Sequence, residues 1–168
     1  DYAVTTGDTF TGNLKLNDGV ELRVGTGDDL KIYHSGNENF IVSTSTSDFK
    51  IRTDSTINIT KSNTEDIAKF IPDGAVELYY DNVKHFETTS GGVKISGTEG
   101  SNAILELYAD EGDDNADKWM QTAHTNSVFY INNYNSGSWE NNIACLGNGQ
   151  VELYYDNALK LQTASTGV

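Results

Sequence analysis

The sequence predicts an all-β protein built from short strands, and three observations support this fold class. Apolar and polar residues alternate with a period of two in many short runs. Gly, Asn, Asp, Ser and Thr separate these runs, whereas proline occurs once, at Pro72. Long stretches with helical periodicity are missing, so no crossover helices are expected. The strands should therefore pair in antiparallel sheets or coil into a solenoid.

The expected strands each show the alternation of a half-buried strand. In chain order they are Val20–Val24, Leu30–His34, Phe49–Ile51, Ile57–Ile59 and Leu105–Leu107. Clusters of turn residues separate them, at 25–29, 35–39, 72–74 and 147–149. Only the stretch from Asp113 to Ala123 suggests a helix, and it has no apolar stripe.

The string VELYYDN occurs twice, at Val76–Asn82 and at Val151–Asn157. An ungapped alignment of residues 74–93 with residues 149–168 matches further positions, which indicates an internal duplication. We therefore expect a lead-in strand with turns at 1–18, a first repeat module at 19–97 and a second at 98–168. The second copy ends at Val168, the equivalent of Val93, while the first continues as a strand to Gly97. We expect the second module to be truncated and the chain to be part of a longer one.

Each copy of the repeat is expected to form a β-hairpin, because Asp-Asn between two alternating runs is a turn signal. A two-residue loop would bury a charge or expose a leucine, so a three-residue loop is predicted. It places Leu78 opposite Phe86 and Tyr80 opposite Lys84. In the second copy it places Leu153 opposite Leu161 and Tyr155 opposite Leu159.

A hairpin with one apolar face is not stable alone and has to pack against a neighbour. That neighbour can be another hairpin of the chain or the same hairpin of another subunit. The residues predicted to pack between subunits are Val76, Leu78, Tyr80, Phe86, Val151, Leu153, Tyr155 and Leu161.

Composition disfavours several classes of partner. The formal net charge is -14 at pH 7, which disfavours nucleic acid and anionic membranes because both require clustered Lys and Arg. No apolar run approaches the roughly 20 residues that span a bilayer. Cys145 is the single cysteine, so neither an intrachain disulfide nor a cysteine-built metal site is expected.

Few residues suggest chemistry, and we predict no catalytic residue, no cofactor and no metal site. Asp113, Asn115 and Asp117 match the start of a calcium loop, but Lys118 stands where the loop glycine belongs and His124 where the bidentate glutamate belongs. These three residues are only partial candidates for a metal site. A pair of repeated carboxylates, Glu77 and Glu152, is read as surface charge, not as a glycosidase pair.

Aromatic side chains mixed with Asn and Ser mark one further region, residues 130–139. Flat rings beside amide groups suit sugars, and they also suit strand ends and packing in any β protein. The candidate sugar contacts are Tyr130, Tyr134 and Trp139.

The wording of the repeat resembles structural proteins of marine tailed phages, cyanophages especially. The resemblance lies in Gly74–Gly97, Leu105–Trp119, Ser136–Glu140 and Gly149–Val168, and in the lead-in Thr6–Leu14. The similar proteins are long fibres of the virion, usually assigned as tail fibres. The resemblance implies an elongated homotrimeric β-helix or β-prism without an active site, found on the virion and in contact with other fibre or tail proteins.

Three hypotheses follow for the function. The first is a structural segment of a homotrimeric tail fibre that supports attachment to a host surface and its glycans. The second is a monomeric carbohydrate-binding β-sandwich or β-solenoid, which requires an exposed aromatic platform. The third is a fibre-borne polysaccharide depolymerase, which requires a carboxylate pair in a groove.

Overall fold

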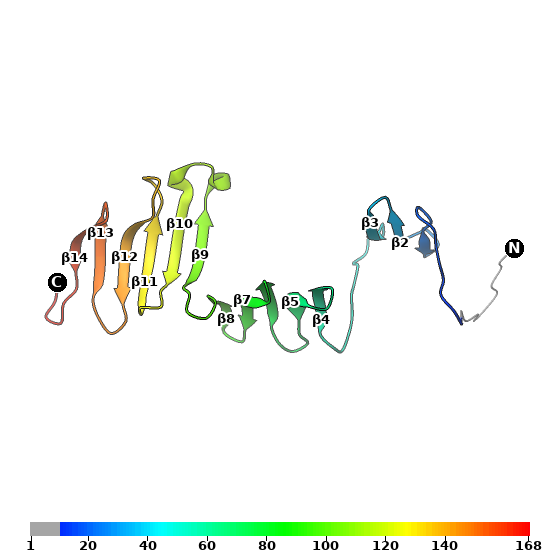
Figure 1. Cartoon of the computed structure of the whole chain (residues 1–168), viewed down its shortest axis with the longest axis horizontal. Coiled ribbons are helices and arrows are strands. Elements are labelled where there is room, and N and C mark those ends of the chain that lie inside the picture. The colour runs from blue at the N-terminus through cyan, green and yellow to red at the C-terminus, as the bar shows by residue number, and fades with distance from the viewer. Residues whose placement is uncertain (1–10) are drawn as a thin grey trace. The chain divides into compact units, whose positions relative to one another are not determined.

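A computed structural model describes residues 11–168 as an all-β chain of three open antiparallel sheets (Figure 1). Two compact units make up the chain, the first ending at Arg52 and the second running from Thr53 to Val168. The first unit holds the sheet β1-β2-β3, formed by β1 (Leu22–Val24), β2 (Leu30–Ser35) and β3 (Glu38–Ser43).

The second unit holds two sheets. One has five strands: β4 (Ile57–Lys61), β5 (Glu65–Phe70), β6 (Val76–Tyr80), β7 (Val83–Thr89) and β8 (Gly92–Ile95). The other has six: β9 (Ala103–Tyr108), β10 (Lys118–Ala123), β11 (Val128–Asn133), β12 (Glu140–Leu146), β13 (Val151–Tyr155) and β14 (Ala158–Gln162). The change of sheet falls between Ile95 and Ala103, close to the expected module boundary at 97/98, which stays a prediction. The described helical segments are two short 3-10 turns, η1 (Asp110–Gly112) and η2 (Asn115–Asp117).

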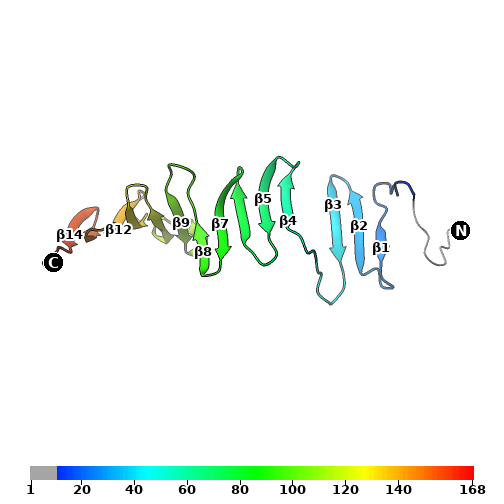
Figure 2. The same ribbon diagram turned by 90° about the horizontal axis from the view of Figure 1, so that it is seen from below.

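Every sheet is a single layer in which each strand pairs with its neighbour along the chain (Figure 2). This meander confirms the predicted all-β class with antiparallel pairing. Among residues 11–168, only Ala68, Ala144, Thr122 and Asn132 are buried, and no large side chain is fully enclosed. The described part of the chain therefore lacks a hydrophobic core of its own. No helix within it is long and apolar enough to cross a bilayer.

The hairpin register corrects one prediction. Leu78 pairs with Phe86 and Leu153 with Leu161, as expected. The loop, however, has two residues, and a β-bulge follows it in each copy. Tyr80 therefore faces Val83 and not Lys84, and Tyr155 faces Ala158 and not Leu159.

The bulge is the physical reason for this correction. Asp and Asn both adopt positive φ in the turns, at 50° and 63° in the first copy, which suits a two-residue hairpin loop. One extra residue on the return strand, His85 in β7, then restores the apolar pairing. The bulge brings the His85 ring beside Tyr80, with ring centroids 6.4 Å apart.

One further local prediction was wrong. Phe49–Ile51 is not a strand; it lies in a segment rich in Ser and Thr, whose hydroxyls accept local backbone bonds, such as Ser47 N to Ser45 Oγ at 3.1 Å. The stretch from Asp113 to Ala123, which lacks an apolar stripe, forms a short 3-10 turn followed by β10, and β10 pairs on both of its edges. Of the lead-in, residues 1–10 lie outside the described part, and residues 11–18 contain no strand.

The duplication extends beyond the repeated letters. In both copies the strand before the hairpin pairs with its first strand, Ala68 with Leu78 and Ile143 with Leu153. The pairing before that also carries a bulge in both copies, after Ile59 and after Ile131. A meander of four strands, β4 to β7, thus recurs as β11 to β14, although the sequence identity is concentrated in its second half.

Candidate functional site

The most distinctive feature of the chain is an apolar sheet face that nothing in its own unit covers. In the six-stranded sheet a row of directly paired residues crosses every strand, and all of its members except one are apolar. The row consists of Leu105, Gln121, Ile131, Ile143, Leu153 and Leu161. A second row beside it consists of Ala103, Ala123, Phe129, Cys145 and Val151. We call these two rows the apolar face of the six-stranded sheet.

The five-stranded sheet carries a matching face. Ala68, Leu78, Phe86 and Ile95 lie opposite one another across β5 to β8. Leu78 is 45% exposed, and Tyr80 on the same face is 78% exposed. The predicted packing residues of both hairpins therefore lie on apolar faces, where they remain accessible to a partner.

The opposite face of the first hairpin holds a network of charges. Lys84 donates to Glu77 at 2.8 Å and also to Glu87, and Lys94 pairs with Glu87 from the next strand. The hydroxyl of Tyr79 donates to Glu77 at 2.5 Å. Only 13% of the Glu77 side chain and 12% of the Glu87 side chain is exposed. The two carboxylates are thus better covered than Leu78 on the other face.

These contacts shift the titration of the network. The bond from Lys84, followed by that from Tyr79, holds the pKa of Glu77 below its usual value. Lys84 and then Lys94 lower the pKa of Glu87 in the same way. The two carboxylates raise the pKa of Lys84 in return. All three groups are therefore charged at neutral pH and stabilise one another.

The second hairpin keeps part of this arrangement and loses the ion pairs. The hydroxyl of Tyr154 donates to Glu152, which raises the pKa of Tyr154 to about 12. Leu159 stands where the first copy has Lys84, and Gln162 where it has Glu87. Leu159 consequently lies on the polar side of its hairpin, opposite the face that carries Leu153.

The repeated asparagine fixes each hairpin to the strand before it. The side-chain oxygen of Asn82 accepts the backbone N–H of Asp66 at 2.8 Å, and that of Asn157 accepts the N–H of Asn141 at 2.9 Å. Both asparagines have positive φ. This residue therefore combines a backbone requirement with a cross-strand contact, which explains why it recurs in both copies.

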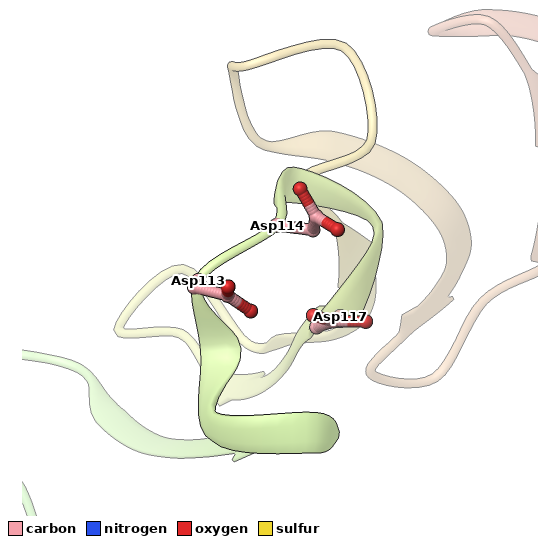
Figure 3. Close-up of side chains that lie close together, drawn as sticks. All are labelled: Asp113, Asp114 and Asp117. Atoms are coloured by element: carbon pink, nitrogen blue, oxygen red, sulfur yellow. The ribbon is translucent and has the colours of Figure 1, made fainter.

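Three aspartates gather on the loop between β9 and β10 (Figure 3). One carboxylate oxygen each from Asp113, Asp114 and Asp117 lies within 4.8 Å of the others. The sequence had singled out Asn115 in place of Asp114, and the side-chain nitrogen of Asn115 lies beside Gly137 in another loop. Nothing further in the described residues points to an ion here.

The candidate sugar contacts divide into two places. Tyr134 and Trp139 lie together, with ring centroids 5.1 Å apart at an angle of 63°. Tyr130 lies beside His124 instead, at 6.0 Å between ring centroids. The candidate carboxylates are also separate, since Glu77 belongs to β6 and Glu152 to β13, in different sheets.

Sequence reasoning missed a third occurrence of part of the repeat. VEL also occurs at Val20–Leu22, at the start of the first sheet. A carboxylate oxygen of Glu21 lies 2.7 Å from Nε of Arg23, which follows it by two residues. Glu77 and Glu152 likewise contact the tyrosine that follows each of them by two residues. Three identical letters are a weak signal, and the shared contact makes the similarity visible.

Comparisons of the chain with protein-family models, with curated proteins and with solved structures find no match in any of the three.

Proposed function

We propose that this chain is a structural segment of a homotrimeric phage tail fibre, which extends from the virion and supports attachment to a host surface. The observation that carries the proposal is the uncovered apolar face that spans all strands of a single-layer sheet. A soluble protein rarely exposes so continuous an apolar surface unless a partner covers it. The repeat wording that resembles marine phage fibres supports the same conclusion.

The mechanism is mechanical. Three copies of the chain bury their apolar faces against one another, so that each sheet supplies one side of a shared core. The charged face of the first hairpin, with Glu77, Lys84 and Glu87 satisfied by one another, then points outward. Like charge on the outside keeps neighbouring fibres apart, since the formal net charge of each chain is -14.

The duplication fits this role. One four-strand meander, used twice, presents the same apolar pairs at two places along the chain, Leu78 with Phe86 and Leu153 with Leu161. Each copy buries the same kind of apolar face, and a fibre becomes longer when further copies are added. The partners in this proposal are two further copies of the chain and, beyond them, other fibre or tail proteins of the virion.

Light scattering after gel filtration tests the proposal. One chain has a mass of 18.3 kDa, so three copies give 54.9 kDa. The proposal requires the larger mass, together with a sedimentation coefficient too small for a sphere of that mass. A particle of one chain mass, stable and free of aggregation, would refute the trimer and favour a monomeric sugar-binding module.

A further inference from the structure

A pocket of about 270 Å³ opens at one end of the six-stranded sheet. Its lining comes from four places along the chain. Glu106 and Tyr108 lie on β9, Lys118 begins β10, Tyr134 follows β11, and Trp139 precedes β12. None of the three hypotheses drawn from the sequence assigned a role to the first three of these residues.

The pocket lies away from the apolar face. Leu105 belongs to that face, and Glu106 follows it on the same strand, so its side chain points to the other side of the sheet. Lys118 and Tyr108 pair directly across the strands and share that other side. The pocket is formed within one chain and stays accessible when the apolar face is covered.

Aromatic rings form two walls of the pocket. Tyr134 and Trp139 meet edge to face, with centroids 5.1 Å apart, so each holds the other's orientation. The ring of Tyr108 also lies near Lys118, and about half of the residue is exposed. Tyr134 and Trp139 therefore hold one another in place before any ligand arrives.

The pocket also holds one donor and one acceptor. The Nζ of Lys118 lies 5.9 Å from the ring centroid of Tyr108 and 5.7 Å from that of Tyr134. Among the ion pairs of residues 11–168, none includes Lys118. Glu106 accepts the hydroxyl of Tyr108 at 2.8 Å and keeps its other oxygen for a second donor.

We propose that this pocket binds a neutral saccharide. A pyranose ring combines an apolar face, which suits the rings of Tyr134 and Trp139, with hydroxyls that donate to Glu106 and accept from Lys118. An acidic sugar fits less well, because Glu106 and the net charge of -14 repel it.

The inference goes beyond the structural role and does not depend on it. A trimer can form without sugar binding, and a single chain contains the whole pocket. Mass and sugar binding are therefore separate measurements, and failure of either one is recognisable by itself.

Native electrophoresis through gels that contain polysaccharide tests the inference on the whole chain. Four gels contain a neutral β-glucan, mannan, galactan or xylan, a fifth contains polygalacturonate, and a sixth contains none. At least one neutral polysaccharide is expected to retard the wild-type chain. Trp139→Ala should weaken that retardation about tenfold or more, as loss of a central aromatic contact does.

Two further variants complete the test. Glu106→Gln keeps the side-chain shape, alters an exposed group and is expected to weaken binding about two- to tenfold. Phe49→Ala removes an exposed aromatic ring from the other unit and should bind as wild type does. The inference is overturned if no neutral gel retards the chain, if polygalacturonate retards it more than every neutral gel, or if Trp139→Ala migrates as wild type.

Discussion

Leu153 tests whether the apolar face of the six-stranded sheet is a subunit interface. It lies in the row that crosses every strand and pairs with Ile143 on one side and Leu161 on the other. In the single chain 40% of it is exposed. The proposed trimer would cover this remainder, so Leu153→Ala should weaken the assembly as well as the fold of each chain.

The magnitude follows from the exposed fraction. Full burial of a leucine side chain contributes about 1.5–3 kcal/mol, so the exposed two-fifths contributes about 0.6–1.2 kcal/mol per chain. Three copies meet in the trimer, which gives a loss of about 2–3.5 kcal/mol per assembly. The constant for trimer dissociation should therefore rise roughly 20- to 400-fold.

Sedimentation velocity over a dilution series measures this constant, because the 18.3 and 54.9 kDa species separate well. The chain offers a matched control in Leu159, a leucine on the same hairpin with similar exposure. It pairs with Tyr154 and faces the polar side. Leu159→Ala should leave the dissociation constant within about threefold of wild type.

Two results would refute the reasoning. If both alanine variants weaken the trimer equally, the interface does not follow the apolar face. If Leu153→Ala dissociates no more readily than wild type, the uncovered leucines do not contribute to assembly.

Three further predictions concern the hairpins. Asn157→Ala should lower the free energy of unfolding by about 1–3 kcal/mol in urea titrations, because alanine loses the contact to Asn141 and disfavours positive φ. Glycine tolerates that φ, so Asn157→Gly should lower the free energy of unfolding by only about half as much. Since the folded pKa of Glu77 is lowered, its network stabilises the fold fully above the unfolded value of about 4.3 and is lost as pH falls through the lower folded pKa. Between about pH 6 and about pH 3 the melting temperature of Glu77→Gln should therefore fall less steeply than that of wild type. Equal slopes for the two proteins would contradict a stabilising role of the network. The pKa of Tyr154 is raised to about 12, so its hydrogen bond to Glu152 stabilises the fold fully below the unfolded pKa of about 10 and is lost as pH rises toward 12. Tyr154→Phe should therefore lose less stability at alkaline pH than wild type does. A loss equal to that of wild type would exclude this bond as its source.

Local sequence predicted the hairpins well and their loops incompletely. The pairing of Leu78 with Phe86 was predictable, because burial of apolar residues on one face selects it. The loop length was not, since a two-residue turn with a bulge and a three-residue loop both give this pairing. Asp and Asn at positive φ select the shorter turn, and the bulge then absorbs the extra residue.

The candidate sites depended on contacts between distant residues. The sequence grouped Tyr130, Tyr134 and Trp139 by their nearness in the chain. Tyr130 lies beside His124, however, whereas Tyr134 and Trp139 line a pocket together with Lys118. Glu106 and Tyr108 enter the same pocket from β9, about 30 residues earlier in the chain. Strand pairing brings these residues together, and no local pattern encodes that pairing.

The sequence by itself determined the all-β class, the antiparallel hairpins, the duplication and the apolar face of each repeat, because alternation and turn residues act over only a few positions. The tertiary structure decided what those signals leave open. It showed that each sheet is a single layer, that the carboxylates of the first hairpin are covered by neighbouring side chains, and that the apolar face has no cover within its unit. Alternation states that a face is apolar, but whether that face meets its own chain or another depends on all the strands together.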